Sequence, residues 1–183
     1  MYVTITTRPD LSAAVNYFSR HQTHQTEELW KGLKRILRYI KGSLDLGLWF
    51  KKGKKESLLC YPDADFGSEY DRKSTSGFLM KVFGNTVYGA SKKQTSVALS
   101  PTESEYIALA MAVSDLLWLK KLLEDFGILV SIPLKVFEDN QSCIHLLHKW
   151  EHRRLKHVDV KYNFVRDLTG KGIVDIKYIS TSQ

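Results

Sequence analysis

The segment from residue 100 to residue 127 predicts one long helix, and this helix constrains the possible folds more than any other feature. Ser100, Pro101 and Glu103 form a capping box that has proline at the first helical position. Apolar residues then recur at helical spacing as far as Phe126, and Gly127 ends the pattern. The helix divides the chain into a part rich in predicted strands before it and a mixed part after it.

Short apolar runs on both sides of this helix predict strands. Before it come three runs that form a meander, with a turn signal at Gly84-Asn85, and after it come a strand, two helices and a last strand. The strands are expected at 57–65, 77–84, 86–93, 133–139 and 172–180, and the two later helices at 140–150 and 157–170. This order predicts an α/β fold, in which a three-strand antiparallel meander and further parallel strands form one mixed sheet packed by helices.

The first 55 residues predict a separate helical segment. Thr26 is a candidate N-cap for a helix over 27–42, and apolar residues recur along it at helical spacing. The run LDLGLWF (44–50) predicts a strand, and the Lys-rich turn around Gly53 is the expected boundary. We therefore expect one unit at 1–55 and a second at 56–183.

Charge and cysteine content narrow the function classes. The formal net charge is +7 and the pI is about 9.3, which favours a polyanionic partner such as nucleic acid. Cys60 and Cys143 have no CxxC spacing, which suits a reducing compartment. No apolar run reaches 18 residues and the N-terminus has no secretion signal pattern, so we expect no membrane association, no secretion, and a cytoplasmic or nuclear location. The sequence has no phosphate-binding glycine loop, so we expect no small-molecule substrate.

Three acidic residues stand where the site of an α/β sheet is expected. Asp63 ends a strand, Glu105 lies in the first turns of the long helix, and Asp139 ends the strand after it. Converging carboxylates repel one another unless hard cations neutralise them, and an all-oxygen ligand set suits Mg²⁺ or Mn²⁺. Asp63 and Asp139 can meet only if their strands are neighbours, and the sequence leaves that open.

Each of these acids has a competitor nearby. Asp65 competes with Asp63, and Glu103 competes with Glu105. The capping box gives Glu103 a structural role, which leaves Glu105 available. Glu138 alternates with Asp139 along its strand and is expected to face the other side.

From these residues a family resemblance follows. The blocks YPDADFGSEYDRKSTSGF, SKKQTSVALSPTESEYIALA, LWLKKLLEDFGI, FEDNQSCIHLL and RRLKHVDVKYNFVRD resemble, in order and spacing, the RNase H region of Copia-type LTR retrotransposon Pol polyproteins. The blocks RPDLSAAVNYFSRH and LKRILRYIKGSLDLGL resemble the end of the reverse transcriptase that precedes it, so residues 1–55 are expected to be a C-terminal piece of that enzyme.

The resemblance implies an RNase H-like domain that hydrolyses the RNA strand of RNA–DNA hybrids during reverse transcription, using two metal ions. It places the family's first three acids at Asp63, Glu105 and Asp139 as catalytic and metal-binding residues. It further implies Mg²⁺ as cofactor, with Mn²⁺ as a substitute, the rest of the Pol polyprotein as a partner, and a virus-like particle in the cytoplasm or the nucleus as the location.

Basic and polar residues near these acids are expected to hold the backbone of the hybrid, since phosphate contacts position a duplex without reading its sequence. The expected contacts are Arg72, Lys73, Ser74, Thr75, Lys92, Lys93, Gln94, Asn140 and Gln141. Ordinary exposed hairpin charge is the alternative explanation for the lysines and Arg72.

The sequence also departs from the family. The family's fourth acid lies in a motif like ADxxTK after the last strand, and these 183 residues contain no such motif. We therefore expect a domain truncated before its last helix, with three of four acids. This leaves open an alternative function as a non-catalytic, nucleic-acid-binding remnant of a retroelement.

Overall fold

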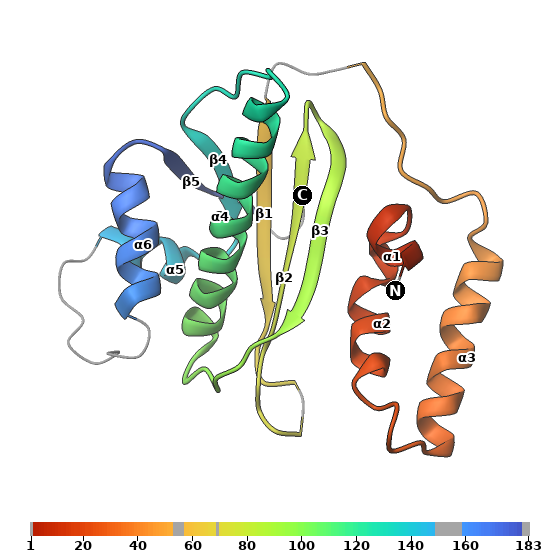
Figure 1. Ribbon diagram of the computed structural model, residues 1–183. Helices are drawn as coiled ribbons and strands as arrows, with labels where there is room; N and C mark the ends of the chain where they lie inside the picture. Colours follow the sequence, from red (N-terminus) through yellow and green to blue (C-terminus); the bar gives the residue numbers. More distant parts are fainter. Residues whose placement is uncertain (1, 53–56, 69, 149–158, 181–183) are drawn as a thin grey trace.

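The structure is a computed structural model that describes residues 2–52, 57–68, 70–148 and 159–180 (Figure 1). Its centre is one five-stranded sheet in the order β3-β2-β1-β4-β5. The strands are β1 (Leu58–Asp65), β2 (Thr75–Val82), β3 (Asn85–Lys93), β4 (Leu134–Glu138) and β5 (Val174–Tyr178). β1, β2 and β3 pair antiparallel, whereas β4 and β5 run parallel to β1. The predicted mixed sheet is confirmed.

The turn between β2 and β3 explains the tight hairpin at this edge. Phe83 and Gly84 have φ angles of 48° and 82°, which is the left-handed conformation at both positions that a two-residue hairpin requires. Gly84 adopts this conformation at no steric cost.

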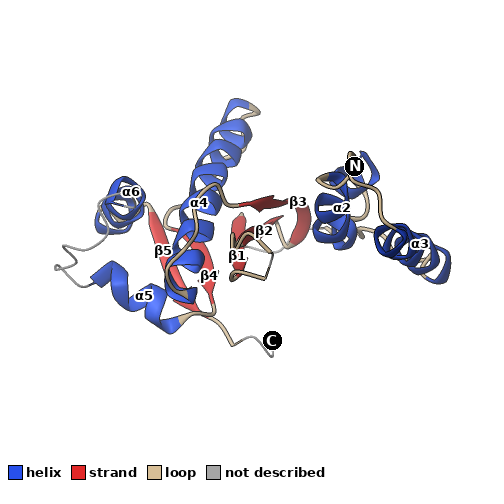
Figure 2. Cartoon of the chain, turned by 90° about the horizontal axis from the view of Figure 1, so that it is seen from below, coloured by secondary structure: helices blue, strands red, loops and turns tan. Residues whose placement is uncertain are grey.

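Helices cover one face of the sheet and build the core with it. They are α4 (Pro101–Asp125), α5 (Gln141–His148) and α6 (Asp159–Gly170). α4 lies across β1 and β2 (Figures 1 and 2). Fully buried Cys60 and Met80 of the sheet meet Tyr106, Leu109 and Val113 of α4.

Both ends of α4 have the predicted caps. The Ser100 hydroxyl accepts a hydrogen bond from Glu103 N (3.2 Å), and Glu103 Oε2 accepts one from Leu99 N (2.8 Å). Glu103 is only 2% exposed, so its structural role is confirmed. At the other end Gly127 has a φ of +77°, and its N–H donates to Glu124 O (2.9 Å). The helix ends there because glycine tolerates this conformation.

Three further helices and one 3-10 turn precede the sheet. They are α1 (Tyr2–Thr6), η1 (Pro9–Leu11), α2 (Ser12–Ser19) and α3 (Glu27–Gly42). They lie beyond β3, on the opposite side of the molecule from α5 and α6 (Figures 1 and 2). The Thr26 side chain caps α3 by accepting from Leu29 N (3.3 Å), as predicted. The apolar side chains of α3 do not enter the core, since Trp30 is 58% and Leu37 is 66% exposed.

The strand predicted over residues 44–50 is wrong. This segment has no strand conformation, and Leu44, Leu46 and Trp49 are largely exposed. After this segment, the backbone of Lys51 contacts the sheet through the side chain of Asn85 in β3. Lys51 N donates to Asn85 Oδ1 (2.8 Å), and Asn85 Nδ2 donates to Lys51 O (3.0 Å). An alternating apolar run becomes a strand only where a neighbouring strand offers its backbone, and here none does among the described residues.

The boundary predicted between residues 55 and 56 lies outside the described residues. Within the described part of the chain, no helix has the length and apolar character that crossing a membrane would require.

Candidate active site

Strand order brings Asp63 and Asp139 together. β1 and β4 are parallel neighbours, with Leu59 opposite Lys135 and Cys60 opposite Val136. Asp63 lies near the carboxyl end of β1, and Asp139 directly follows β4, so both stand at the same edge of the sheet. The first turns of α4 bring in Glu105. One carboxylate oxygen from each of these three acids lies within 4.8 Å of the others.

Two of these acids, Glu105 and Asp63, lie in surroundings that disfavour their negative charge. Glu105 is 9% exposed, and burial, together with the nearby charges of Glu138, Asp63 and Asp139, raises its pKa to about 8. Partial burial and the charge of Asp139 also raise the pKa of Asp63 above its usual value. A site that disfavours its own negative charges in this way is suited to a cation that would neutralise them.

The competing acids have other roles. Glu103 caps α4, as described above. The Asp65 carboxylate accepts a hydrogen bond from the Ser68 hydroxyl (2.6 Å) and so ties the end of β1 to the loop that follows it. These contacts favour Asp63 and Glu105 over their neighbours as the residues at the centre of the site.

Glu138 faces the other side of β4 from Asp139, as predicted, but its burial beside the site was not predicted. Its face of β4 is the one that Leu134 and Val136 bury against the helices, and Glu138 is fully buried. Its charge is the largest electrostatic contribution that raises the pKa of Glu105. Burial raises the pKa of Glu138 itself to about 8, and its Oε1 accepts from Asn140 N (3.1 Å). An acid at the inward position of an apolar strand was the signal that could have identified it.

The donor atoms of this site fit a hard divalent cation. They are carboxylate oxygens, and neither a thiolate nor an imidazole takes part in the cluster. Oε2 of Glu105 and Oε2 of Glu138 are buried and have no hydrogen-bond partner within the part of the chain that the structure describes. Such buried oxygens are costly unless a ligand contacts them. Of the two, only Glu105 belongs to the convergent cluster.

Several of the residues expected to contact nucleic acid are accessible around the site. Arg72, Lys92 and Gln141 are exposed, while Lys73 and Thr75 are half-buried. Lys93 is also half-buried, and its ammonium pairs with Asp71 at 2.9 Å, which ties the loop after β1 to the end of β3. Of these side chains, those of Arg72, Lys92 and Gln141 are the most accessible to solvent.

The other three expected contacts have structural roles here. Ser74 is fully buried and its hydroxyl accepts from Gly67 N (3.1 Å). Gln94 is 6% exposed, and its Nε2 donates to Ser76 Oγ (2.9 Å) and Ser104 O (3.0 Å), which joins the sheet to α4. Asn140 caps α5, because its Oδ1 accepts from Cys143 N (3.0 Å). These hydrogen bonds give all three side chains a structural role, and burial shields Ser74 and Gln94 from solvent.

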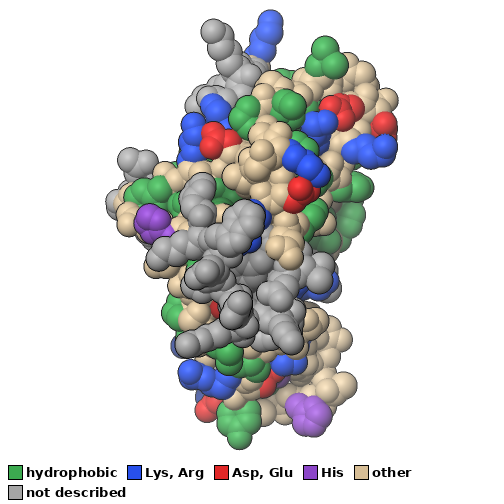
Figure 3. Space-filling model, turned by 90° about the vertical axis from the view of Figure 1, so that its left-hand side faces the viewer, with side chains coloured by type: hydrophobic (Ala, Val, Ile, Leu, Met, Phe, Trp, Pro, Cys, Tyr) green, Lys and Arg blue, Asp and Glu red, His purple; other side chains and the backbone are tan. Residues whose placement is uncertain are grey.

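A cleft of about 760 Å³ opens beside Asp63. Its floor is the face of β1 and β2 that carries Tyr61, Asp63 and Asp65, and Lys93 lies at one side. On the face of the molecule seen in Figure 3, in contrast, basic side chains stand beside acidic ones. One exposed ion pair, between Lys171 and Asp167 (2.7 Å), lies at the end of α6.

Comparison with known proteins places this architecture in a family. No protein-family model matches the chain. The Pol polyprotein from transposon RE2 of Arabidopsis thaliana is 38% identical over 177 residues, which is 96% of this chain but 12% of that protein. The Pol polyprotein from transposon TNT 1-94 of Nicotiana tabacum is 37% identical over the whole chain and 14% of its own length. The chain thus spans about an eighth of the length of these relatives.

The chain is also similar in sequence to a protein of another name and in structure to a solved ribonuclease H. A protein of Plasmopara viticola named secreted RxLR effector protein 161 is 43% identical over 120 residues, which is 65% of this chain and 84% of that protein. The crystal structure of LC11-RNase H1 in complex with an RNA/DNA hybrid superposes with a TM-score of 0.51 at 15% identity, over 68% of this chain and 86% of that one. This likeness shows a shared RNase H fold. The chain belongs to the retrovirus-related Pol polyproteins of Copia-type transposons, and its sheet and helices have the RNase H fold.

Proposed function

We propose that the chain is a ribonuclease H that hydrolyses the RNA strand of RNA–DNA hybrids during reverse transcription, and that Asp63, Glu105 and Asp139 hold its divalent cations. The observation that carries the proposal is the convergence of three carboxylates from β1, α4 and the end of β4 within 4.8 Å. The RNase H fold and the Pol relatives support it. The reaction would take place in a virus-like particle in the cytoplasm or in the nucleus, together with the rest of the Pol polyprotein.

The chemistry follows from the ligand set. Bound Mg²⁺, or Mn²⁺ in its place, would activate a water for attack on a phosphodiester and stabilise the oxygen that leaves. Asp63, Glu105 and Asp139 would supply the anionic oxygens that hold the ions at one edge of the sheet. The Glu105 side chain is buried and its backbone belongs to the capped helix α4, so the position of its carboxylate is fixed. Exposed Arg72 and Lys92 would contact the hybrid's phosphates and position it without reading sequence.

The fold would select the hybrid by shape. A duplex that contains one RNA strand carries 2′-hydroxyls along that strand and has a groove shape unlike that of B-form DNA. LC11-RNase H1, which shares this fold, was crystallised with an RNA/DNA hybrid. Binding without cleavage is the less favoured alternative, because it gives no reason for three carboxylates to converge.

The proposal is tested by comparing the parent with Asp139→Asn. The parent should cleave the RNA strand of a labelled hybrid with Mg²⁺ or Mn²⁺, and Asp139→Asn should abolish cleavage and weaken Mn²⁺ binding measured by calorimetry without substrate. Asp167→Asn is the matched control, because this exposed acid on α6 pairs with Lys171 and should leave both readouts unchanged. Hybrid that stays intact with the parent under both metals contradicts the proposal.

A further inference from the structure

The cleft beside Asp63 has a second wall that the proposed function does not use. Across from the sheet, the cleft is lined by α2 and the residues that follow it, including Tyr17, Arg20 and His21. These residues belong to the helical segment before the sheet, yet they share one cleft with Asp63 and Lys93. A wall of this kind can bind a ligand if it is fixed relative to the sheet and carries side chains that complement the ligand.

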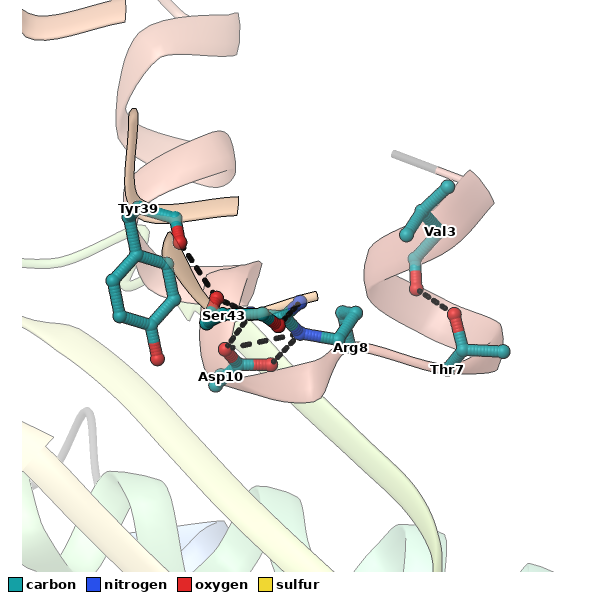
Figure 4. Close-up of polar contacts among 6 residues, drawn as sticks. All are labelled: Val3, Thr7, Arg8, Asp10, Tyr39 and Ser43. Atoms are coloured by element: carbon teal, nitrogen blue, oxygen red, sulfur yellow. Dashed lines mark hydrogen bonds and ion pairs between the residues drawn. The ribbon is translucent and has the colours of Figure 1, made fainter. Parts of the chain in front are cut away.

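Arg8 holds the helical segment together. Arg8 is 7% exposed, and its guanidinium pairs with Asp10 at 2.9 Å and donates to Ser43 O (3.0 Å) and Ser43 Oγ (2.8 Å), as Figure 4 shows. It also lies 5.5 Å from the centre of the Tyr39 ring. One side chain thus joins the turn before α2 to the end of α3. Because α2 also packs against β3, the wall is fixed relative to the sheet.

Tyr17, Arg20 and His21 form one compact group, which we call the α2 cluster. The Tyr17 ring lies 4.9 Å from the His21 ring, and the Arg20 guanidinium lies 5.7 Å from the centre of the Tyr17 ring. Arg20 Nε also donates to Asn16 O (3.3 Å), which directs the side chain. Tyr17 is 40% exposed, so part of its ring is open to a ligand. A planar cation beside an accessible aromatic ring suits phosphate and a stacked base or sugar.

The negative charge on the floor of the cleft gives the basic residue of the α2 cluster a role in binding a polyanion. The floor carries Asp63 and Asp65, which repel a phosphate wherever no cation neutralises them. A polyanionic strand that reaches these acids therefore needs fixed positive charge on either side of them. Lys93 supplies some on the sheet wall, although Asp71 partly neutralises it. Arg20 is the basic side chain of the opposite wall.

We propose that the α2 cluster binds the sugar–phosphate backbone of the nucleic acid that enters this cleft, so that the helical segment before the sheet forms part of the substrate site. The inference rests on the proposed function, since it takes a nucleic acid as the ligand of the carboxylate site. In this arrangement Arg20 contacts a phosphate away from the acids, and Tyr17 packs against a sugar or base.

The test measures binding of a fluorescent RNA–DNA hybrid to the full 183-residue protein, without divalent ions, at several salt concentrations. Arg20→Gln should weaken binding about tenfold and lower the slope of log affinity against log salt by about 0.9, as expected for one lost phosphate contact. Tyr17→Ala should weaken binding by about tenfold with the slope unchanged, because stacking carries no counterion release. Arg20→Lys should keep the slope.

Arg35→Gln is the matched control. It removes the same charge from an exposed position on α3 that does not line the cleft, and it should change neither affinity nor slope. Thermal unfolding of each variant shows whether the Arg20 bond to Asn16 matters for folding, and Arg20→Lys keeps the test valid if Arg20→Gln is unstable.

An Arg20→Gln variant that is folded and binds with the parent's affinity and slope overturns the inference, and so does a parent that does not bind hybrid. Cleavage is a separate readout. If the parent binds hybrid, loses affinity on Arg20→Gln, and yet never cleaves, the proposed function fails while the role of the α2 cluster stands.

Discussion

Replacing Glu103 by alanine should destabilise the protein by an amount that the α4 cap allows us to work out. The change removes the partly buried hydrogen bond in which Glu103 Oε2 accepts from Leu99 N (2.8 Å), which costs about 1 kcal/mol. Loss of a carboxylate from the first turn of the helix costs about 0.3–1 kcal/mol more. The sum is about 1.3–2 kcal/mol, and at about 2–4 °C per kcal/mol the melting temperature should fall by roughly 3–8 °C.

Thermal unfolding followed by circular dichroism measures this shift. Glu124→Ala is the control in the same helix, because Glu124 forms an exposed pair with Lys120 near the end of α4, where the helix dipole disfavours negative charge. It should cost about 0–0.5 kcal/mol. Cleavage should also fall in Glu103→Ala, because the first turns of α4 hold Glu105. A melting temperature equal to that of Glu124→Ala would refute the capping argument.

Two further predictions concern the site and the core. The surroundings of Glu105 raise its pKa to about 8 from the ordinary 4.5, so the folded state holds an extra proton between these two pH values. The metal-free protein should therefore lose stability as pH rises from about 4.5 to about 8. Over the same range divalent-ion binding should tighten and release a proton, which calorimetry in two buffers measures. An affinity independent of pH would count against Glu105 as a ligand. Met80→Ala in β2 should lower the free energy of unfolding by about 2–5 kcal/mol, because Met80 is fully buried against α4. Leu79→Ala, on the opposite and half-buried face, should lower it less, as denaturant unfolding would show. Equal losses would contradict the assignment of the core face.

Local signals made parts of this structure predictable. The Ser100–Glu103 cap and the Gly127 stop are decided by hydrogen bonds and backbone conformations within a few residues, so they can be read along the chain. The same holds for the Thr26 cap and for the hairpin at Gly84. For the same reason the capping box already separated Glu103 from Glu105.

The failures arose where a partner distant in sequence decides the outcome. Residues 44–50 alternate like a strand but stay outside the sheet, because pattern alone supplies no neighbouring backbone. The burial of Ser74 and Gln94, which hydrogen-bond to Gly67 and Ser104, was not predicted either.

The sequence by itself determined the order of strands and helices from residue 57 onward, the caps of the long helix and the three acids worth following. Only the tertiary structure decided that β1 and β4 are neighbours, which brings Asp63 to Asp139, and that the buried face of β4 points Glu138 toward the helix that carries Glu105. It also decided that α2 closes one side of the cleft. The physical reason is that helix caps and turns are local equilibria, whereas a site is a set of distances between segments that only strand pairing and packing can set.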